Sequence, residues 1–315
     1  MQPAPLISAI IPTFNRAEQV CRAIQSVLQQ TYSNVEIVVV NDGSTDNTVA
    51  ALEKFGNKVR VINQRNAGVA AARNRAVSVS QGEIVAFLDS DDEWLPTKLE
   101  RQVEVMTALG PEFGACFTDC MHVVESHQEI SGFEKAGFEP SGPGPLRSPL
   151  KHVLAKYPIV YIPTLIVQRS LIAGQSGFDE AMTVSEDTDL IFRLALKTRL
   201  CFVAESLVKI DRAASRSGGL MELFSQSDER VYDSRHRMFS KWLQFSLDVE
   251  TRRNIQSQFR AMLYDSATAR MRRLSITGTL QKIYEIHSAG DDYLTIGATL
   301  LRRGVGRLYK VVLKS

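Results

Sequence analysis

The sequence has few cysteines, no long apolar run and, at its N-terminal end, none of the pattern of a secretory leader. None of its cysteines forms a CxxC pair, which argues against a zinc ribbon and against a disulfide-stapled secreted domain. No window of about 20 apolar residues occurs, so we expect no membrane-spanning helix. The N-terminal segment lacks a basic start followed by a long apolar run, so we expect no signal peptide. Together these absences predict a cytoplasmic protein whose cysteines, at positions 21, 116, 120 and 201, are reduced thiols.

Charge is distributed unevenly along a chain of 315 residues whose overall composition is that of an ordinary globular protein. Residues 1–229 hold 21 Lys and Arg against 28 Asp and Glu, whereas residues 230–315 hold 16 against 7. The net charge of +2 therefore hides a basic C-terminal part, which favours an anionic partner such as a lipid surface. Nucleic acid is disfavoured as a partner because no stripe of stacking aromatic residues accompanies the basic ones.

Short segments rich in valine and isoleucine alternate with segments of helical periodicity in the N-terminal part of the chain. Two of them, EIVVV (36–40) and EIVAFL (83–88), are apolar throughout, as central parallel strands buried on both faces are. This order predicts an α/β fold with a mainly parallel, Rossmann-like sheet flanked by helices. The other strand-like segments are at 8–11, 58–62 and 114–117, and the helical segments are at 16–30, 45–55 and 68–80.

The pattern becomes less regular in the second half of the chain. A Gly- and Pro-rich segment (132–149) predicts a loop, and EDTDLIFRLALK (186–197) predicts an amphipathic helix. CFVAES (201–206) predicts a strand, and a second loop (211–219) precedes a mostly helical remainder. We therefore expect a first domain of residues 1–219, with halves 1–119 and 120–219, and a basic helical region of residues 220–315.

Polar motifs follow three of the predicted strands. PTFNR (12–16) comes after the first strand, NDGSTD (41–46) after the second and DSDD (89–92) after the fourth. Ligands of parallel α/β sheets bind beyond the carboxyl ends of the strands. The three motifs therefore predict one ligand-binding crevice at this edge of the sheet.

Two residues in these motifs have the chemistry to bind a nucleobase. The carboxylate of Asp42 suits a base N–H because it accepts hydrogen bonds, and the ring of Phe14 suits the plane of a base. The alternatives are a turn at Asp42 with helix caps at 44–46, and a Phe14 that packs in the core. The functional roles support one another because the two residues end adjoining strands.

Two further motifs suit a phosphate and a cation. In NAGVAAARN (66–74) the helix N-terminus favours an anion and Arg73 offers a bidentate fork, with a surface ion pair as the alternative. In DSDD the carboxylates of Asp89 and Asp91 suit a hard divalent cation that also binds substrate phosphates. Solvation of these acids by bulk water is the alternative.

SEDTDL (185–190) places carboxylates in the first turn of a predicted helix. The helix dipole stabilises such charges without any catalytic role. The same position keeps Asp187 ionised near neutral pH, so that it suits the role of a general base.

The ordered set PTFNR, DGSTD, NAGVAAARN, FLDSDDEW and SEDTDL resembles glycosyltransferase family 2, the inverting nucleotide-sugar transferases with the GT-A fold. The resemblance covers about residues 6–215. It implies sugar transfer from a nucleotide sugar, with UDP as the nucleotide by family frequency, and Mg²⁺ or Mn²⁺ as cofactor. The implied acceptor is a saccharide or a lipid-linked molecule in bacterial surface polysaccharide or glycolipid synthesis. It implies Asp187 as catalytic base, Asp91 as metal ligand, Pro12, Phe14, Asp42, Arg73 and Asp89 in the nucleotide-sugar site, and Trp94 and Glu186 toward the acceptor.

One loop departs from the family pattern. The family often carries a Tyr-Arg-x-His-type sequence there, whereas KIDRAASRSGG (209–219) has no histidine. Arg212 and Arg216 are then the residues expected to reach the diphosphate when this Gly- and Ser-rich loop closes as a lid.

The C-terminal segment LLRRGVGRLYKVVLKS (300–315) lies outside the resemblance. At about 100° per residue its apolar and basic side chains fall on opposite sides, the pattern of a helix on an anionic membrane surface. We expect peripheral attachment to the inner face of the cytoplasmic membrane, with a terminal helix packed on the domain as the alternative. The apolar side holds Leu301, Val305, Leu308, Tyr309 and Val312, and the basic side holds Arg302, Arg303, Arg307, Lys310 and Lys314.

Three rival functions share parts of this pattern. A haloacid-dehalogenase-type phosphatase also has a DxD motif after a strand, but its nucleophilic Asp lies near the chain start, unlike Asp89. A non-catalytic nucleotide-sugar-binding scaffold at the membrane fits the basic C-terminal segment equally well and makes Asp187 dispensable. A sugar nucleotidyltransferase needs a Gly-rich phosphate loop after the first strand, which this sequence lacks.

Overall fold

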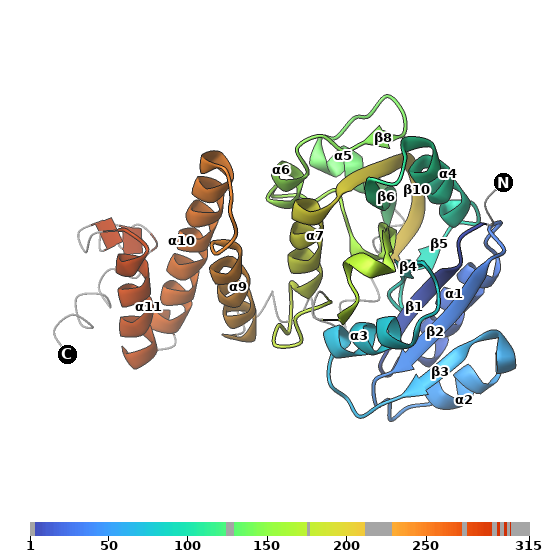
Figure 1. Ribbon diagram of the computed structural model, residues 1–315. Coiled ribbons are helices and arrows are strands. Elements are labelled where there is room, and N and C mark those ends of the chain that lie inside the picture. The colour runs from blue at the N-terminus through green and yellow to red at the C-terminus, as the bar shows by residue number, and fades with distance from the viewer. Residues whose placement is uncertain are drawn as a thin grey trace. The chain divides into compact units, whose positions relative to one another are not determined.

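The chain divides into two compact units, called unit 1 (Met1–Gly219) and unit 2 (Leu220–Ser315). The computed structural model describes residues 4–123, 129–174, 177–211, 229–272, 276–291, 295–296, 299–300 and 303. Figure 1 shows a β-sheet with its helices in unit 1, and helices in unit 2.

Unit 1 contains ten strands among the described residues. They are β1 (Ile7–Thr13), β2 (Val35–Asn41), β3 (Arg60–Asn63), β4 (Ile84–Phe87), β5 (Glu93–Trp94), β6 (Phe113–Val123), β7 (Glu129–Ser131), β8 (Gly144–Pro145), β9 (Leu165–Gln168) and β10 (Arg199–Asp211).

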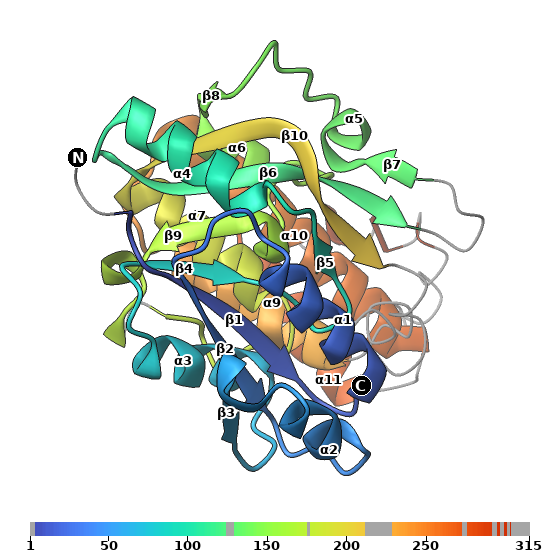
Figure 2. The same cartoon turned by 90° about the vertical axis from the view of Figure 1, so that its right-hand side faces the viewer.

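These strands form one mixed sheet in the order β3-β2-β1-β4-β9-β6-β10-β5, with β7 paired to β6 and β8 to β10. The strands β3, β2, β1 and β4 are parallel to one another. Strand β9 is antiparallel to both of its neighbours, β4 and β6. Figure 2 shows β6 and β10 side by side, and they run parallel.

The helices of unit 1 cover both faces of this sheet. They are α1 (Ala17–Leu28), α2 (Thr48–Glu53), α3 (Val69–Val79), α4 (Lys98–Leu109), α5 (Gly132–Ala136), α6 (Pro149–Val153) and α7 (Glu186–Lys197). Short 3-10 turns occupy Gly56–Lys58, Ile162–Thr164 and Arg169–Leu171.

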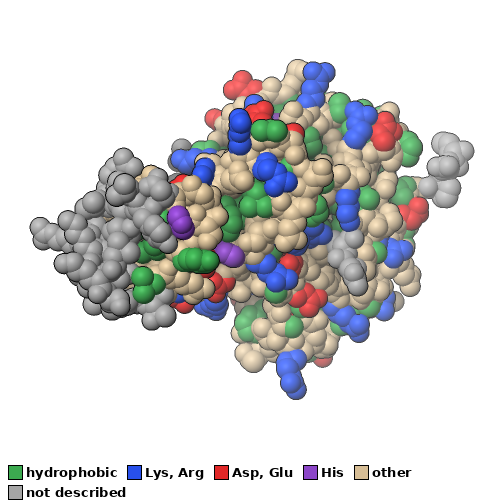
Figure 3. All heavy atoms as spheres, turned by 60° about the vertical axis from the view of Figure 1, so that its left-hand side comes forward, with side chains coloured by type: hydrophobic (Ala, Val, Ile, Leu, Met, Phe, Trp, Pro, Cys, Tyr) green, Lys and Arg blue, Asp and Glu red, His purple; other side chains and the backbone are tan. Residues whose placement is uncertain are grey.

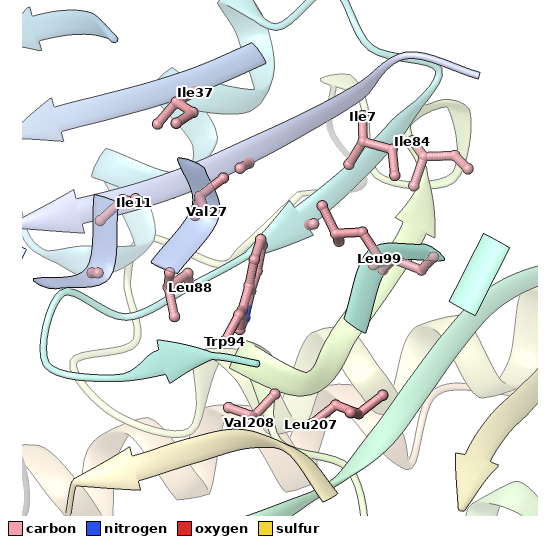
Figure 4. Close-up of a cluster of buried hydrophobic side chains, with 14 of the residues drawn as sticks. Ile7, Ile11, Val27, Ile37, Ile84, Leu88, Trp94, Leu99, Leu207 and Val208 are labelled. Atoms are coloured by element: carbon pink, nitrogen blue, oxygen red, sulfur yellow. The ribbon is translucent and has the colours of Figure 1, made fainter. Parts of the chain in front are cut away.

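Strand β1 explains how the two faces are covered. All seven of its residues are buried, as expected of a central strand with helices on both sides. Ile7, Ala9 and Ile11 belong to a hydrophobic cluster that also holds residues of α1 and α4 (Figure 4). Because side chains alternate along a strand, Ile10 points to the opposite face, where α3 packs on β1 and β2. The polar residues that follow these strands are therefore held by a closely packed sheet with helices on both faces.

The predicted α/β fold is confirmed, with two differences in detail. The five N-terminal strand-like segments form β1, β2, β3, β4 and β6, but the antiparallel β9 was not expected. Its four residues carry too little pattern to distinguish a strand from a loop. Within the predicted loop 132–149, a short helix, α5, begins after Ser131, whose hydroxyl accepts a hydrogen bond from the Glu134 N–H, and ends at Gly137 with φ 64°.

In its described residues, unit 2 has the helices α9 (Glu229–Trp242), α10 (Val249–Arg272) and α11 (Ile276–Ser288), and α10 packs against the other two. None of the helices in the described part of the chain is both long and apolar enough to cross a membrane. On the face shown in Figure 3, acidic, basic and hydrophobic side chains of the described residues are interspersed.

Most of the predicted amphipathic segment 301–314 lies outside the described residues. Arg303 is described, and its guanidinium forms an ion pair with Asp265 of α10 and lies 5.6 Å from the centre of the Tyr264 ring. One cation of the predicted membrane-facing side therefore pairs within unit 2.

Candidate functional site

The polar motifs leave the sheet along one edge, at the carboxyl ends of β1, β2 and β4. These strands are neighbours in the order β2-β1-β4. The backbone N–H of Asp42, just after β2, donates to the carbonyl of Thr13, the last residue of β1, at 2.9 Å. Phe14 and Asp42 are thus held beside each other by the strand pairing.

Asp42 is buried and holds the loop that leads into α3. Its Oδ1 accepts hydrogen bonds from Gln64 Nε2 at 2.7 Å and from the Ala67 N–H at 2.9 Å. Its Oδ2 accepts one from the Gly68 N–H at 2.8 Å. Because a carboxylate oxygen can accept two hydrogen bonds, Oδ2 retains capacity for a ligand N–H.

Gly43 allows the two loops at this site to approach each other. Its φ of 78° lies in the left-handed region that favours glycine. A Cβ at this position would lie 2.7 Å from the backbone nitrogen of Asn66, so a side chain would displace the loop that Asp42 holds.

Phe14 is 45% exposed and therefore does not pack in the core, which was the alternative to a role in base binding. The next residue, Asn15, has φ 51° and is held by hydrogen bonds to the loop after β2. Its N–H donates to Ser44 Oγ at 2.9 Å, and its Oδ1 accepts from the Thr45 N–H at 2.7 Å. The turn that presents the ring is therefore anchored to the loop after β2.

Pro12 is buried inside β1, where it pairs with Val40 of β2. Proline is rare in a central strand because it lacks an N–H. The pairing of β1 with β4 ends at Ile10, whose carbonyl accepts from the Leu88 N–H at 2.9 Å. The backbone of Pro12 faces β4, as that of Ile10 does, but Pro12 lies two residues further along β1. The two strands no longer pair there, so the missing N–H of Pro12 costs no hydrogen bond of the sheet.

Arg73 of α3 is 3% exposed and its guanidinium joins two carboxylates. Its Nη2 lies 2.6 Å from Asp89 Oδ1, and its Nη1 lies 2.7 Å from Glu186 Oε1. Burial lowers the pKa of Arg73, but the charges of Asp89, Glu186 and Asp187 outweigh burial and raise it above its usual value. Both arms of the fork thus contact carboxylates in this structure, and a contact of Arg73 with a phosphate stays a prediction.

Glu186 and Asp187 open helix α7 after Ser185, whose φ is 64°. Glu186 is buried, and burial together with the charge of Asp187 raises its pKa to about 7, against the opposing effect of Arg73. Asp187 is only half-buried, and its Oδ1 accepts hydrogen bonds from the Thr188 N–H at 2.6 Å and from Thr188 Oγ1 at 3.2 Å. Asp187 is thus the more accessible of the two carboxylates.

The remaining acids after β4 also have partners. Asp91 Oδ1 lies 2.7 Å from Arg16 Nη1, and Asp92 Oδ1 accepts a hydrogen bond from the Asp211 N–H at 3.0 Å. Burial raises the pKa of Asp91, with Arg16 opposing and Asp89 adding to the rise. Arg16 was not among the residues expected at the site, although an arginine directly before a helix is an unusual signal.

The residues present fit a metal ion only if a substrate supplies further ligands. Within the described ranges, no group of three or more His, Cys, Asp and Glu side chains is arranged to hold a metal. Mg²⁺ and similar ions bind through one or two carboxylates, waters and substrate phosphates. Asp91, next to Asp89 at a strand end, meets that requirement, whereas an all-protein site does not exist among these residues.

The residues expected toward the acceptor are buried. Trp94 is 3% exposed, its indole N–H donates to the Pro163 carbonyl at 2.9 Å, and Lys98 Nζ lies 4.2 Å from the ring centre. Glu186 is taken up by Arg73. A role of either residue toward the acceptor stays a prediction. The expected lid residues Arg212 and Arg216 lie outside the described residues.

Comparison of sequences identifies related proteins. The sequence profile described as "Glycosyl transferase family 2" matches residues 8–148. An uncharacterized glycosyltransferase of Rickettsia prowazekii is 30% identical over 236 residues, which cover 71% of this chain and 70% of that protein. The putative teichuronic acid biosynthesis glycosyltransferase TuaG of Bacillus subtilis is 42% identical over 106 residues, 32% of this chain and 42% of that protein.

Two solved structures share the fold at low identity. Residues 1–349 of S. aureus TarS, in complex with UDP-GlcNAc, match with a TM-score of 0.68 and 18% identity, covering 98% of this chain and 91% of that one. The mannosyltransferase PcManGT from Pyrobaculum calidifontis, in complex with GDP-Man and Mn²⁺, matches with a TM-score of 0.58, covering 99% and 83%. At such identities the likeness shows the GT-A fold alone. Together with the long alignment to the Rickettsia protein, the profile match shows that this chain belongs to glycosyltransferase family 2.

Proposed function

We propose that this chain is an inverting, metal-dependent glycosyltransferase that moves a sugar from a UDP-sugar to an acceptor hydroxyl. One observation carries the proposal: Arg73 joins Asp89, at the end of β4, to Glu186, the neighbour of Asp187 at the start of α7. These ion pairs therefore tie the donor-side motif to the residue that directly precedes the proposed base. Such fixed relative placement is what a reaction between two bound substrates requires.

The nucleotide is proposed to bind at the ends of β1 and β2. Asp42 Oδ2 has the remaining capacity to accept the imide N–H of uracil, and the exposed ring of Phe14 offers a surface for the base. TarS, which has the same fold, is solved with UDP-GlcNAc, whereas PcManGT is solved with GDP-Man. We favour UDP, and GDP is the alternative that the experiment includes.

Asp187 is proposed as the general base. Its carboxylate takes the proton of the acceptor hydroxyl while that oxygen attacks the anomeric carbon, and the bond from this carbon to the diphosphate oxygen breaks. A single displacement inverts the configuration at the anomeric carbon. Glu186 is the less suitable base because it is buried and paired with Arg73.

Asp91, with Asp89 beside it, is proposed to hold Mg²⁺ or Mn²⁺. When bound, the cation supplies Lewis-acid neutralisation of the charge that develops on the leaving diphosphate. The Mn²⁺ in the PcManGT complex supports this assignment. The role of TuaG, named for teichuronic acid biosynthesis, supports an acceptor in bacterial surface polysaccharide synthesis, with a saccharide or lipid-linked acceptor as the partner.

Calorimetric titration of UDP, GDP and dTDP into the purified chain, with and without Mn²⁺, tests the donor. We expect UDP to bind in a Mn²⁺-dependent manner, and the anomeric configuration of the product then tests inversion by NMR. Binding of none of the three nucleotides in the presence of Mn²⁺ would contradict the proposal. Binding of UDP without release of UDP from any UDP-sugar and acceptor would instead favour a non-catalytic scaffold.

A further inference from the structure

Arg16 occupies a position that helix chemistry disfavours. It is the residue directly before α1, and its carbonyl accepts the first intrahelical hydrogen bond, from the Val20 N–H at 3.0 Å. Ser, Thr, Asp and Asn are preferred there because their side chains accept hydrogen bonds from the helix, and a positive charge opposes the helix dipole. The Arg16 side chain makes no such cap. Its presence therefore needs another explanation.

The side chain of Arg16 leaves the helix and reaches Asp91. Nη1 lies 2.7 Å from Asp91 Oδ1 and donates to Ser90 Oγ at 3.4 Å. The Asp91 side chain is only 11% exposed, so its carboxylate is largely removed from water and needs a cation beside it. In this structure Arg16 supplies that cation.

The backbone of Arg16 is fixed, whereas its side chain is long and partly exposed. The Arg16 N–H donates to Thr48 Oγ1 at 3.1 Å, and the preceding Asn15 is held by the loop after β2. The Arg16 side chain is 29% exposed, and the same nitrogen contacts both Asp91 and Ser90 among the described residues. Rotation about side-chain bonds is therefore able to move the guanidinium without disturbing the strand end.

Arg73 provides the contrast. Its guanidinium contacts Asp89 and Glu186 with two different nitrogens, and its side chain is 4% exposed. Release of Arg73 would leave two carboxylates without their cation, one of them the buried Glu186, whereas release of Arg16 leaves only Asp91, which an incoming cation can neutralise. The two arginines thus suit different tasks, a permanent bridge for Arg73 and an exchangeable contact for Arg16.

We propose that Arg16 is an exchangeable counter-cation that holds Asp91 before the donor binds and then contacts the donor's diphosphate. This inference rests on the proposed function. Arg16 and a divalent cation would compete for the Asp91 carboxylate, because each is a positive charge that would neutralise the same group. Once Arg16 yields Asp91 to the cation, its guanidinium fork is free to bind phosphate oxygens, for which it has the matching geometry.

The substitution Arg16→Gln tests the exchange because it should change two affinities in opposite directions. Mn²⁺ binding in the absence of nucleotide, measured by the EPR signal of free Mn²⁺, should tighten by about threefold or more because a competing cation is removed. UDP binding at saturating Mn²⁺, measured by calorimetry, should weaken by about tenfold, the typical effect of losing one charge-assisted hydrogen bond.

Arg22→Gln is the matched control. Arg22 lies on the same helix and forms an exposed ion pair with Glu93 at 3.2 Å, so the same substitution should leave both affinities unchanged. Arg16→Lys keeps the charge but loses the fork. It should bind free Mn²⁺ like the wild type and UDP less tightly, and it serves as the test if Arg16→Gln does not fold.

Three results would overturn the inference. Weaker binding of both Mn²⁺ and UDP by Arg16→Gln would make Arg16 a structural clasp of the Asp91 loop. Unchanged UDP affinity would remove any contact with the diphosphate. In either case the wild type still binds UDP with Mn²⁺, so the proposed function stands. Failure of the wild type to bind any of the nucleotides would overturn the proposed function as well.

Discussion

Asp187 and Glu186 are adjacent in the chain but differ in surroundings. Glu186 is buried and paired with Arg73, whereas Asp187 is half-buried and contacts only its neighbour Thr188 in the hydrogen bonds given above. A base must exchange its proton with an incoming hydroxyl and then with solvent. Its greater accessibility is therefore the reason to propose Asp187, rather than the neighbouring carboxylate Glu186, as the base.

Replacing Asp187 with Asn should abolish transfer and preserve donor binding. The amide keeps the size of the side chain but cannot accept a proton, so we expect kcat to fall by about 10²- to 10⁴-fold. The affinity for UDP, measured by calorimetry, should stay within about twofold, since no base contact is assigned to this residue. Glu180→Gln, an exposed carboxylate on the same segment, is the control. Normal transfer by Asp187→Asn would show that another group is the base.

Glu186 should make stability depend on pH. Its folded-state pKa of about 7 lies above the ordinary value of 4.5. The folded state therefore holds the proton more tightly than the unfolded state does. The stability that this proton contributes is complete below pH 4.5 and is lost as the pH rises through about 7. Relative to Glu186→Gln, the wild type should lose up to about 3 kcal/mol of unfolding free energy between pH 4 and pH 8. Urea denaturation at both pH values measures this, and a pH-independent difference would contradict it.

The residue types at the site were readable from the sequence, but their partners were not. Arg73 and Asp89 were both assigned to the donor site, yet the fork of Arg73 contacts carboxylates from β4 and α7, which are far apart in the chain. Trp94 follows the acidic motif in sequence but turns into the core, where Pro163 accepts its N–H. Such contacts depend on tertiary packing, which no local pattern encodes.

At the scale of elements, helix α3 connects the two halves of unit 1. Arg73 joins it to β4 and α7, and the next residue, Asn74, donates to the Phe178 carbonyl at 2.9 Å and accepts from the Phe178 N–H at 2.8 Å. The aromatic ring of Phe178 in turn lies 5.2 Å from the Arg73 guanidinium. Consecutive residues of one helix therefore fix the segment that leads into the proposed base.

Replacing Arg73 with Met should destabilise unit 1 strongly. The substitution leaves the carboxylates of Asp89 and Glu186 without their shared cation, and breaking a buried ion pair in this way costs about 3–5 kcal/mol. Guanidinium-induced unfolding measures the loss. Arg75→Met, an exposed arginine on the same helix, should change stability by less than about 0.5 kcal/mol. Equal effects of the two substitutions would mean that the bridge contributes little. Arg73→Lys, which keeps one of the two contacts, should fall between them.

The elements with a clear period were predictable, and those defined by long-range pairing were not. The expected helix 186–197 coincides with α7, and the expected helices near 16–30 and 68–80 contain α1 and α3. Strand β9 owes its existence to its neighbours β4 and β6, between which it inserts. Likewise β10 extends from Arg199 to Asp211, well beyond the segment 201–206, because β6, β5 and β8 pair along its length.

At the scale of the whole molecule, the two units differ in composition as well as in architecture. The acidic part of the chain forms the sheet and the proposed site, whereas residues 230–315 hold most of the excess positive charge. Family membership rests mainly on unit 1, since the matching profile ends at residue 148. The function of unit 2 therefore has to be argued from its own chemistry, and charge is its most distinctive property.

Deleting residues 301–315 should weaken binding to anionic vesicles. The deleted segment carries five basic residues, and each cation near an anionic surface contributes about 1 kcal/mol, or about fivefold in the partition constant. Co-sedimentation with vesicles of phosphatidylglycerol and phosphatidylcholine in equal parts measures the loss, which added salt should mimic in the full chain.

Arg303→Gln is the internal control for this deletion. Because Arg303 pairs with Asp265, its loss should weaken vesicle binding less than Arg307→Gln does. UDP affinity should be unchanged in all three variants. Retention of the truncated chain on the vesicles would assign membrane attachment to another part of the protein.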